Sequence, residues 1–140
     1  MRKNLKKLML PVIAFGMYSW CNAAEFPLAA NGKSNTLIHF DVNATRPEIR
    51  AAAELQSYLG KITGAKDILR AVNPTVFFRM KGLSNYTEIL LVTLENGKPL
   101  IPGDMYSKLE KASSDEAFYI KTDPADKRII IAGKKPIGVL

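Results

Sequence analysis

Residues 45–64 read TRPEIRAAAELQSYLGKITG and predict one amphipathic helix with both of its ends marked. Thr45 and Glu48 have the spacing of a capping box, in which each side chain binds the backbone N–H of the other residue. Pro47 stands in the first turn, where its missing N–H is harmless, and Gly64 is the expected stop. Apolar and polar side chains fall on opposite faces over about 16 residues, so we expect this helix to lie on an apolar core.

Apolar, β-branched runs on both sides of this helix predict five strands. The first run alternates, with Ile38 and Phe40 on one face and Leu37, His39 and Asp41 on the other. The last two runs flank the turn sequence Asp-Pro-Ala-Asp. The expected strands are residues 36–42, 75–80, 88–94, 117–122 and 128–132, and a second, short helix is expected at 103–111.

The element order β–α–β–β–α–β–β predicts an α+β fold. We expect a two-layer sandwich whose mixed, mostly antiparallel sheet of about five strands carries one long and one short helix on one face. The chain of 140 residues allows one domain. It is too short for a (β/α)₈ barrel, which takes about 250 residues.

The first 23 residues predict a signal peptide. Four basic residues precede an apolar run at residues 8–17, and the small residues Cys21, Ala23 and Ala24 follow it. A lipoprotein anchored through Cys21 is the alternative, but Trp20 stands where a small residue is normal. We therefore expect cleavage near Ala23 or Ala24 and export to the periplasm or the medium. Residues 24–35 are then a flexible lead-in, and residues 36–140 are the folded domain.

The charge of the chain is concentrated in this leader. The formal net charge is +7, and removal of residues 1–23, which hold four basic and no acidic residues, leaves +3. The basic residues that remain are dispersed, so nucleic acid is not an expected partner. The apolar run of about ten residues is also too short for a transmembrane helix.

Three groups of residues are candidates for chemical sites. Asp115-Glu116 is an adjacent acidic pair, but it opens a strand, where neighbouring side chains point to opposite faces. His39 is the only histidine and is expected at the surface or in an interface, because it cannot build a zinc site alone. Gly133-Lys134-Lys135 lacks the other residues of a phosphate-binding loop. We predict no catalytic, cofactor or metal-binding residue.

Three segments together resemble a known domain. Residues 50–65 (RAAAELQSYLGKITGA) resemble the helix of the non-catalytic N-terminal α+β domain found in exported glycoside hydrolases. These enzymes include bacterial β-N-acetylhexosaminidases of glycoside hydrolase family 20 and α-glucuronidases. Residues 115–122 (DEAFYIKT) and 129–140 (IIIAGKKPIGVL) resemble the closing strands of that domain.

This resemblance implies a chain that stops before the final helix of the domain and before the catalytic barrel, its expected partner. The catalytic Asp-Glu pair of the family belongs to the barrel, so the resemblance gives no catalytic role to Asp115 or Glu116. Without the final helix, the apolar strand pairs Ile89/Leu91, Phe118/Ile120 and Ile129/Ile131 are expected to lose part of their cover, and self-association would follow.

The leading hypothesis is therefore a non-catalytic accessory domain that supports the barrel of a carbohydrate-degrading hydrolase. Leu37, His39 and Asp41 are expected to contribute to that interface. One alternative is a free-standing carbohydrate- or surface-binding module. A second is a small hydrolase that uses Asp115 and Glu116.

Overall fold

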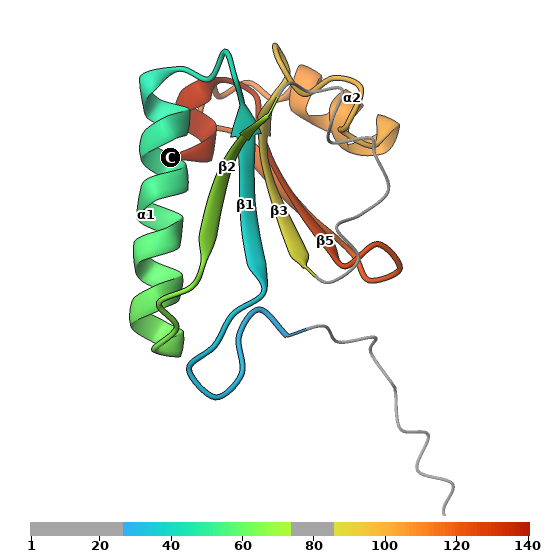
Figure 1. Ribbon diagram of the computed structural model, residues 1–140. Helices are drawn as coiled ribbons and strands as arrows, with labels where there is room; N and C mark the ends of the chain where they lie inside the picture. The colour runs from blue at the N-terminus through green and yellow to red at the C-terminus, as the bar shows by residue number, and fades with distance from the viewer. Residues whose placement is uncertain (1–26, 74–85) are drawn as a thin grey trace, which may run out of the picture.

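The computed structural model describes residues 27–73 and 86–140, which form one mixed sheet with two α-helices (Figure 1). The expected α+β class and five-stranded mixed sheet are confirmed. The elements follow the order β1 (Thr36–Asp41), α1 (Arg46–Thr63), β2 (Leu69–Asn73), β3 (Thr87–Thr93), α2 (Gly103–Lys111), β4 (Phe118–Asp123), β5 (Arg128–Gly133) and a final 3₁₀ turn, η2 (Pro136–Val139).

The predicted long helix is confirmed as α1, including both of its ends. Thr45 is extended and forms the capping box with Glu48, whose carboxylate accepts from the Thr45 backbone N–H at 2.8 Å. Gly64 ends the helix in the left-handed conformation, at φ 71°, and donates its N–H to the Gly60 carbonyl. The left-handed conformation ends the helix, and glycine adopts it without the strain that a side chain would cause.

The expectation of a mostly antiparallel sheet is wrong. The strand order is β2-β1-β3-β5-β4, and the β1–β2, β1–β3 and β3–β5 pairs are all parallel. Only β4 and β5, which a tight turn joins, are antiparallel. The physical reason is the connection between β1 and β2. Helix α1 carries the chain back to the level at which β1 begins, so β2 runs in the same direction as β1 and the two strands pair in parallel.

Strand β2 was not predicted, because LRAVN is short and mixes polar with apolar residues. It pairs with β1 over five residues at one edge of the sheet, with Leu37 opposite Leu69. An edge strand buries little surface, so its sequence carries a weak pattern. The strand expected at residues 75–80 lies outside the described residues.

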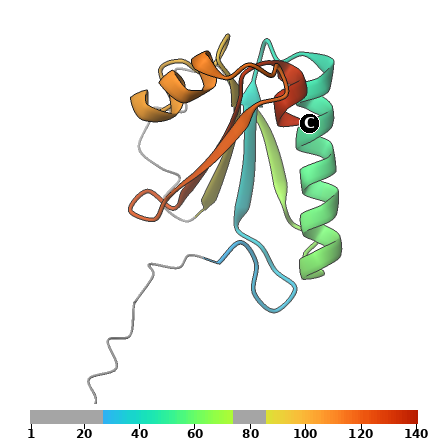
Figure 2. The ribbon, with the colours of Figure 1, turned by 180° about the vertical axis from the view of Figure 1, so that it is seen from behind.

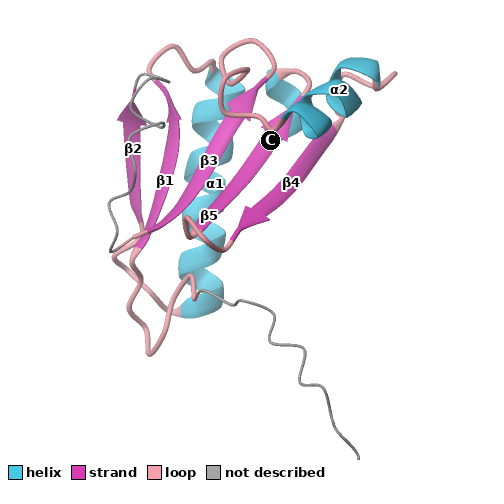
Figure 3. Ribbon diagram, turned by 90° about the vertical axis from the view of Figure 1, so that its right-hand side faces the viewer, coloured by secondary structure: helices cyan, strands magenta, loops and turns pink. Residues whose placement is uncertain are grey.

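The two helices lie on opposite faces of the sheet, which corrects the expectation that both cover one face. Ile89 and Leu91 pack with Ile38 and Phe40 against α1. Leu90 and Val92, the alternate residues of β3, pack against α2 together with Met105 and Leu109. Figure 3 shows α1 running behind the sheet, with α2 on its near side. The continuous apolar run of β3 is typical of a strand buried on both faces.

The last residues of the chain close the structure against α1. Turn η2 lies beside α1 and the end of β5, as Figure 2 shows from behind, and its Val139 is buried in the α1 core. Gly138 is needed here, because a Cβ at this position would lie 2.7 Å from the Ala117 carbonyl oxygen. The segment of residues 133–140 therefore belongs to the packed domain.

Glu48 provides the first test of this fold. Its side chain is 1% exposed and accepts hydrogen bonds from Thr45 and from the Asn96 amide. Glu48→Ala removes the acceptor of these part-buried hydrogen bonds and the N-terminal cap of α1, so we expect the free energy of unfolding to fall by about 1–3 kcal/mol. Urea denaturation followed by circular dichroism measures this loss.

Glu54→Ala is the matched control on the same helix. Glu54 forms only a partly exposed pair with Arg50, and such pairs contribute about 0.5 kcal/mol or less. Equal losses in the two variants would contradict the role assigned to Glu48.

Candidate functional site

A polar pocket of about 410 Å³ lies where β1 and β3 end. We call it the switch-point pocket, and its lining residues are Asp41, Asn43, Thr45, Glu48, Thr93, Glu95 and Asn96. Beyond β1 the chain enters α1 on one face of the sheet, and beyond β3 it leads to α2 on the other. Adjacent parallel strands whose connections diverge in this way leave a crevice at their carboxyl ends, where α/β proteins commonly bind ligands.

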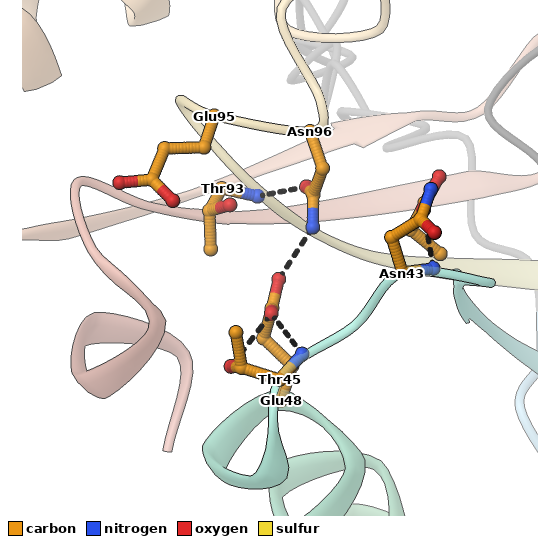
Figure 4. A pocket seen from close by; sticks show the side chains of 7 residues that line it. Asn43, Thr45, Glu48, Thr93, Glu95 and Asn96 are labelled. Atoms are coloured by element: carbon orange, nitrogen blue, oxygen red, sulfur yellow. Dashed lines mark hydrogen bonds between the residues drawn. The ribbon is translucent and has the colours of Figure 1, made fainter.

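Glu48 holds the two walls of this pocket together (Figure 4). One of its carboxylate oxygens accepts from the backbone N–H and the hydroxyl of Thr45, each at 2.8 Å. The other accepts from the Asn96 side-chain amide at 2.6 Å, and the Asn96 oxygen accepts from the Thr93 backbone N–H at 2.9 Å. The start of α1 is thus connected to the loop after β3.

The electrostatics of the pocket disfavour anions. A helix N-terminus attracts negative charge, but here the carboxylate of Glu48 already lies there, bonded to the N-cap residue Thr45. Asp41 and Glu95 add two more carboxylates to the lining, and among the described residues no lysine or arginine lines the pocket. Lys135 pairs with Glu95 from outside at 2.9 Å, and this hydrogen bond raises the pKa of the Lys135 ammonium.

These carboxylates do not converge on one point. Within residues 27–73 and 86–140, no three acidic, histidine or cysteine side chains are grouped so that they could hold a metal ion. The pocket therefore presents separated oxygen and amide groups, an arrangement suited to hydrogen bonding across an extended ligand.

Asp115 and Glu116 lie elsewhere, exposed in the turn that precedes β4. The Ser114 hydroxyl accepts from the Glu116 backbone N–H at 3.1 Å, so this segment is organised as a turn. Neither carboxylate lines the switch-point pocket. The fold therefore keeps this pair apart from the three carboxylates of the pocket.

The Gly-Lys-Lys segment at the end of β5 serves the fold. Lys134 donates to the Ala112 carbonyl at 2.5 Å and so ties β5 to the end of α2. Lys135 is engaged by the Glu95 carboxylate.

His39 is buried, which corrects the expectation of a surface or interface histidine. It is 6% exposed, and Leu37 and Asp41 on the same face of β1 are also buried, so these three residues present no open interface. Burial lowers the pKa of His39 below its ordinary value, against the opposing effect of the Glu88 carboxylate, while the Arg128 guanidinium lowers it further. Glu88 and Arg128 themselves form a half-buried ion pair at 2.8 Å.

An apolar face lies on the α1 side of the sheet, beyond the edge of the helix. It consists of Phe118 and Ile120 of β4 and of Ile129 and Ile131 of β5. Phe118 is 56% and Ile120 is 58% exposed, whereas Ile89 and Leu91 are covered by α1. Of the three strand pairs expected to be incompletely covered, Phe118/Ile120 is exposed and Ile129/Ile131 is partly buried, whereas the expectation is wrong for Ile89/Leu91, which is buried.

A shallow groove continues this apolar face toward the helix. It has a volume of about 190 Å³ and lies between α1 and β5; Leu55, Tyr58, Ile131, Val139 and Leu140 are among its lining residues. The apolar face and this α1 groove together form one uncovered apolar surface that extends from β4 across β5 to α1. Surfaces of this kind commonly mark interaction sites.

Sequence reasoning did not identify Thr93 and Asn96 as site residues. They follow the apolar run of β3 in the sequence Thr-Leu-Glu-Asn-Gly, and polar residues directly after a fully buried strand are the signal that could have found them. Their proximity to Glu48 depends on the parallel pairing of β1 with β3, which the expected antiparallel sheet did not provide.

No family model and no curated protein matches this chain. In the part of the chain that the structure describes, no helix has both the length and the apolar character needed to cross a membrane.

The pKa of His39 leads to a pH-dependent stability. Because the folded state lowers this pKa below 6.5, the unfolded chain binds the proton more readily, and acid favours unfolding. We expect the urea concentration at half-unfolding to become lower as the pH falls from about 7.5 to about 5.5.

His39→Gln removes the titrating group and keeps a polar side chain. The decline should become shallower in this variant, as followed by circular dichroism at each pH. A wild-type midpoint that is constant over this range, or an undiminished decline in the variant, would contradict the assignment.

Proposed function

We propose that this chain is a non-catalytic accessory domain that docks against the catalytic barrel of an exported glycoside hydrolase. The observation that carries the proposal is the apolar face on β4 and β5, with Phe118 and Ile120 more than half exposed. An occupant with a complementary apolar surface would remove these side chains from water. The resemblance to glycoside hydrolase N-terminal domains supports a catalytic barrel as this occupant.

The three resembling segments support this occupant because they meet around one surface. Helix α1 contains most of the first segment, the second contains all of β4 except Asp123, and most of the third lies in β5 and η2. β4 pairs with β5, while η2 packs against both α1 and β5. The α1 groove is lined from the first and third segments and opens beside the second. Residues that resemble the family therefore surround the proposed docking surface.

The position of the acidic pair favours docking over catalysis. Asp115 and Glu116 are exposed turn residues at the start of β4, beside the apolar face rather than in a cleft. General acid–base hydrolysis of a glycosidic bond needs two carboxyl groups on either side of the bond, about 5–10 Å apart. A glycosidase activity of this chain that disappears in Asp115→Asn or Glu116→Gln would overturn the proposal in favour of a small hydrolase.

Export belongs to the same proposal. The basic, apolar and small residues of the first 23 positions have the order of a signal peptide, so the domain and its barrel would act in the periplasm or outside the cell.

The isolated chain should self-associate through the uncovered apolar face. Ile120→Asp places a charge in that face and should increase the monomer fraction, as measured by sedimentation velocity over a concentration series. Ile62→Asp is the matched control, because Ile62 is 80% exposed near the end of α1, away from the apolar face. A wild-type chain that is monomeric throughout the series would contradict this expectation.

The docking itself can be measured with separate polypeptides. The catalytic barrel of an exported family 20 β-N-acetylhexosaminidase is expressed alone, and binding of the chain to it is followed by calorimetry. We expect Ile120→Asp to weaken binding at least tenfold, because the charge would be buried without a partner.

Ile62→Asp should bind like the wild type. Equal weakening by both variants, or no binding by the wild-type chain, would overturn the docking proposal.

A further inference from the structure

Thr93 has a feature that the fold does not account for. Its side chain is 1% exposed, and among the described residues no group is placed to hydrogen-bond with its hydroxyl. A buried hydroxyl without a partner is unfavourable, and native proteins contain few of them. Thr93 lines the switch-point pocket, where Figure 4 shows it facing the Thr45–Glu48 wall from the loop side.

The location of the pocket is a second, independent indication of ligand binding. It lies at the carboxyl ends of two adjacent parallel strands whose connections pass to opposite faces. Its volume of about 410 Å³ lies within the range of about 300–1,000 Å³ usual for small-molecule sites.

The lining groups indicate the chemistry of the ligand. In the part of the chain that the structure describes, they are carboxylates, side-chain amides and hydroxyls, with no aromatic, lysine or arginine side chain among them. Both donors and acceptors are present and are distributed around the pocket. Vicinal hydroxyl groups, each of which donates and accepts, match such a lining, whereas a single metal ion would need convergent ligands.

The charge of the pocket indicates which charge the ligand can carry. The carboxylates of Asp41 and Glu48 repel a carboxylate or phosphate group on the ligand, whereas Glu95 is paired with Lys135. A neutral sugar, or one that carries an ammonium group, meets no such penalty.

We propose that the switch-point pocket binds a small polyhydroxylated ligand of the sugar class, neutral or amino-bearing, with the Thr93 hydroxyl as one of its hydrogen-bonding partners. The proposal is independent of docking, because no residue of the apolar face lines this pocket. A small hydrophilic ligand held by hydrogen bonds alone should bind with modest affinity, with a Kd on the order of 1 mM.

The test uses the full chain labelled with ¹⁵N and titrated with glucose, N-acetylglucosamine, glucosamine and glucuronate. We expect saturable amide shifts at residues 41–48 and 93–97 with at least one of the first three sugars, and at least fivefold weaker binding of glucuronate. Thr93→Val keeps the side-chain shape, removes the hydroxyl and should weaken binding at least fivefold.

Thr122→Val is the matched control, since Thr122 is an exposed threonine of β4 outside the pocket. Asn43→Ala offers a second route, because the exposed Asn43 side chain can be removed even if Thr93→Val perturbs the fold. Three outcomes would overturn the proposal. They are equal binding by the wild type and both pocket variants, tighter binding of glucuronate than of the other sugars, and amide shifts with Mg²⁺ or Ca²⁺ alone. Ile120→Asp should leave sugar binding unchanged, so failure here and failure of docking can be told apart.

Discussion

Strand β3 is apolar on both of its faces, and covering both faces determines the rest of the architecture. Ile89 and Leu91 require a helix on one side of the sheet, and Leu90 and Val92 require one on the other. Helix α1 meets the first need and α2 the second, so the connections beyond β1 and β3 diverge. This divergence opens the switch-point pocket, and because α1 lies over β1 and β3, it leaves the α1 side of β4 uncovered.

The two surfaces that result have opposite chemistry. The switch-point pocket is polar and acidic, and Glu48 keeps its walls together through Thr45 and Asn96. The apolar face on β4 and β5 offers exposed Phe118 and Ile120 with a groove beside them. Different elements supply the two surfaces, so the two proposed interactions do not compete for the same residues.

Much of the fold could be predicted from local patterns. The capping box and Gly64 located α1, and the segment Gly103–Lys111 was identified as α2 with its observed ends. The strands β1, β3, β4 and β5 were each predicted to within about two residues, the usual uncertainty of element boundaries. Strand β2 was missed because an edge strand carries a weak pattern. Of the candidate site, Thr45 and Glu48 were singled out as a helix cap and Asp41 as an interface residue, and none was assigned to a pocket.

The sequence by itself determined where helices and strands begin and end, because caps, glycine stops and side-chain periodicity act between residues a few positions apart. Only the tertiary structure decided that β1 and β3 pair in parallel, that the helices take opposite faces, and that Glu48 meets Asn96 across 48 positions of the chain. Strand periodicity indicates which side chains share a face, but it says nothing of which strand lies beside it or in which direction. Those choices follow from the packing of all elements at once, and both candidate surfaces depend on them.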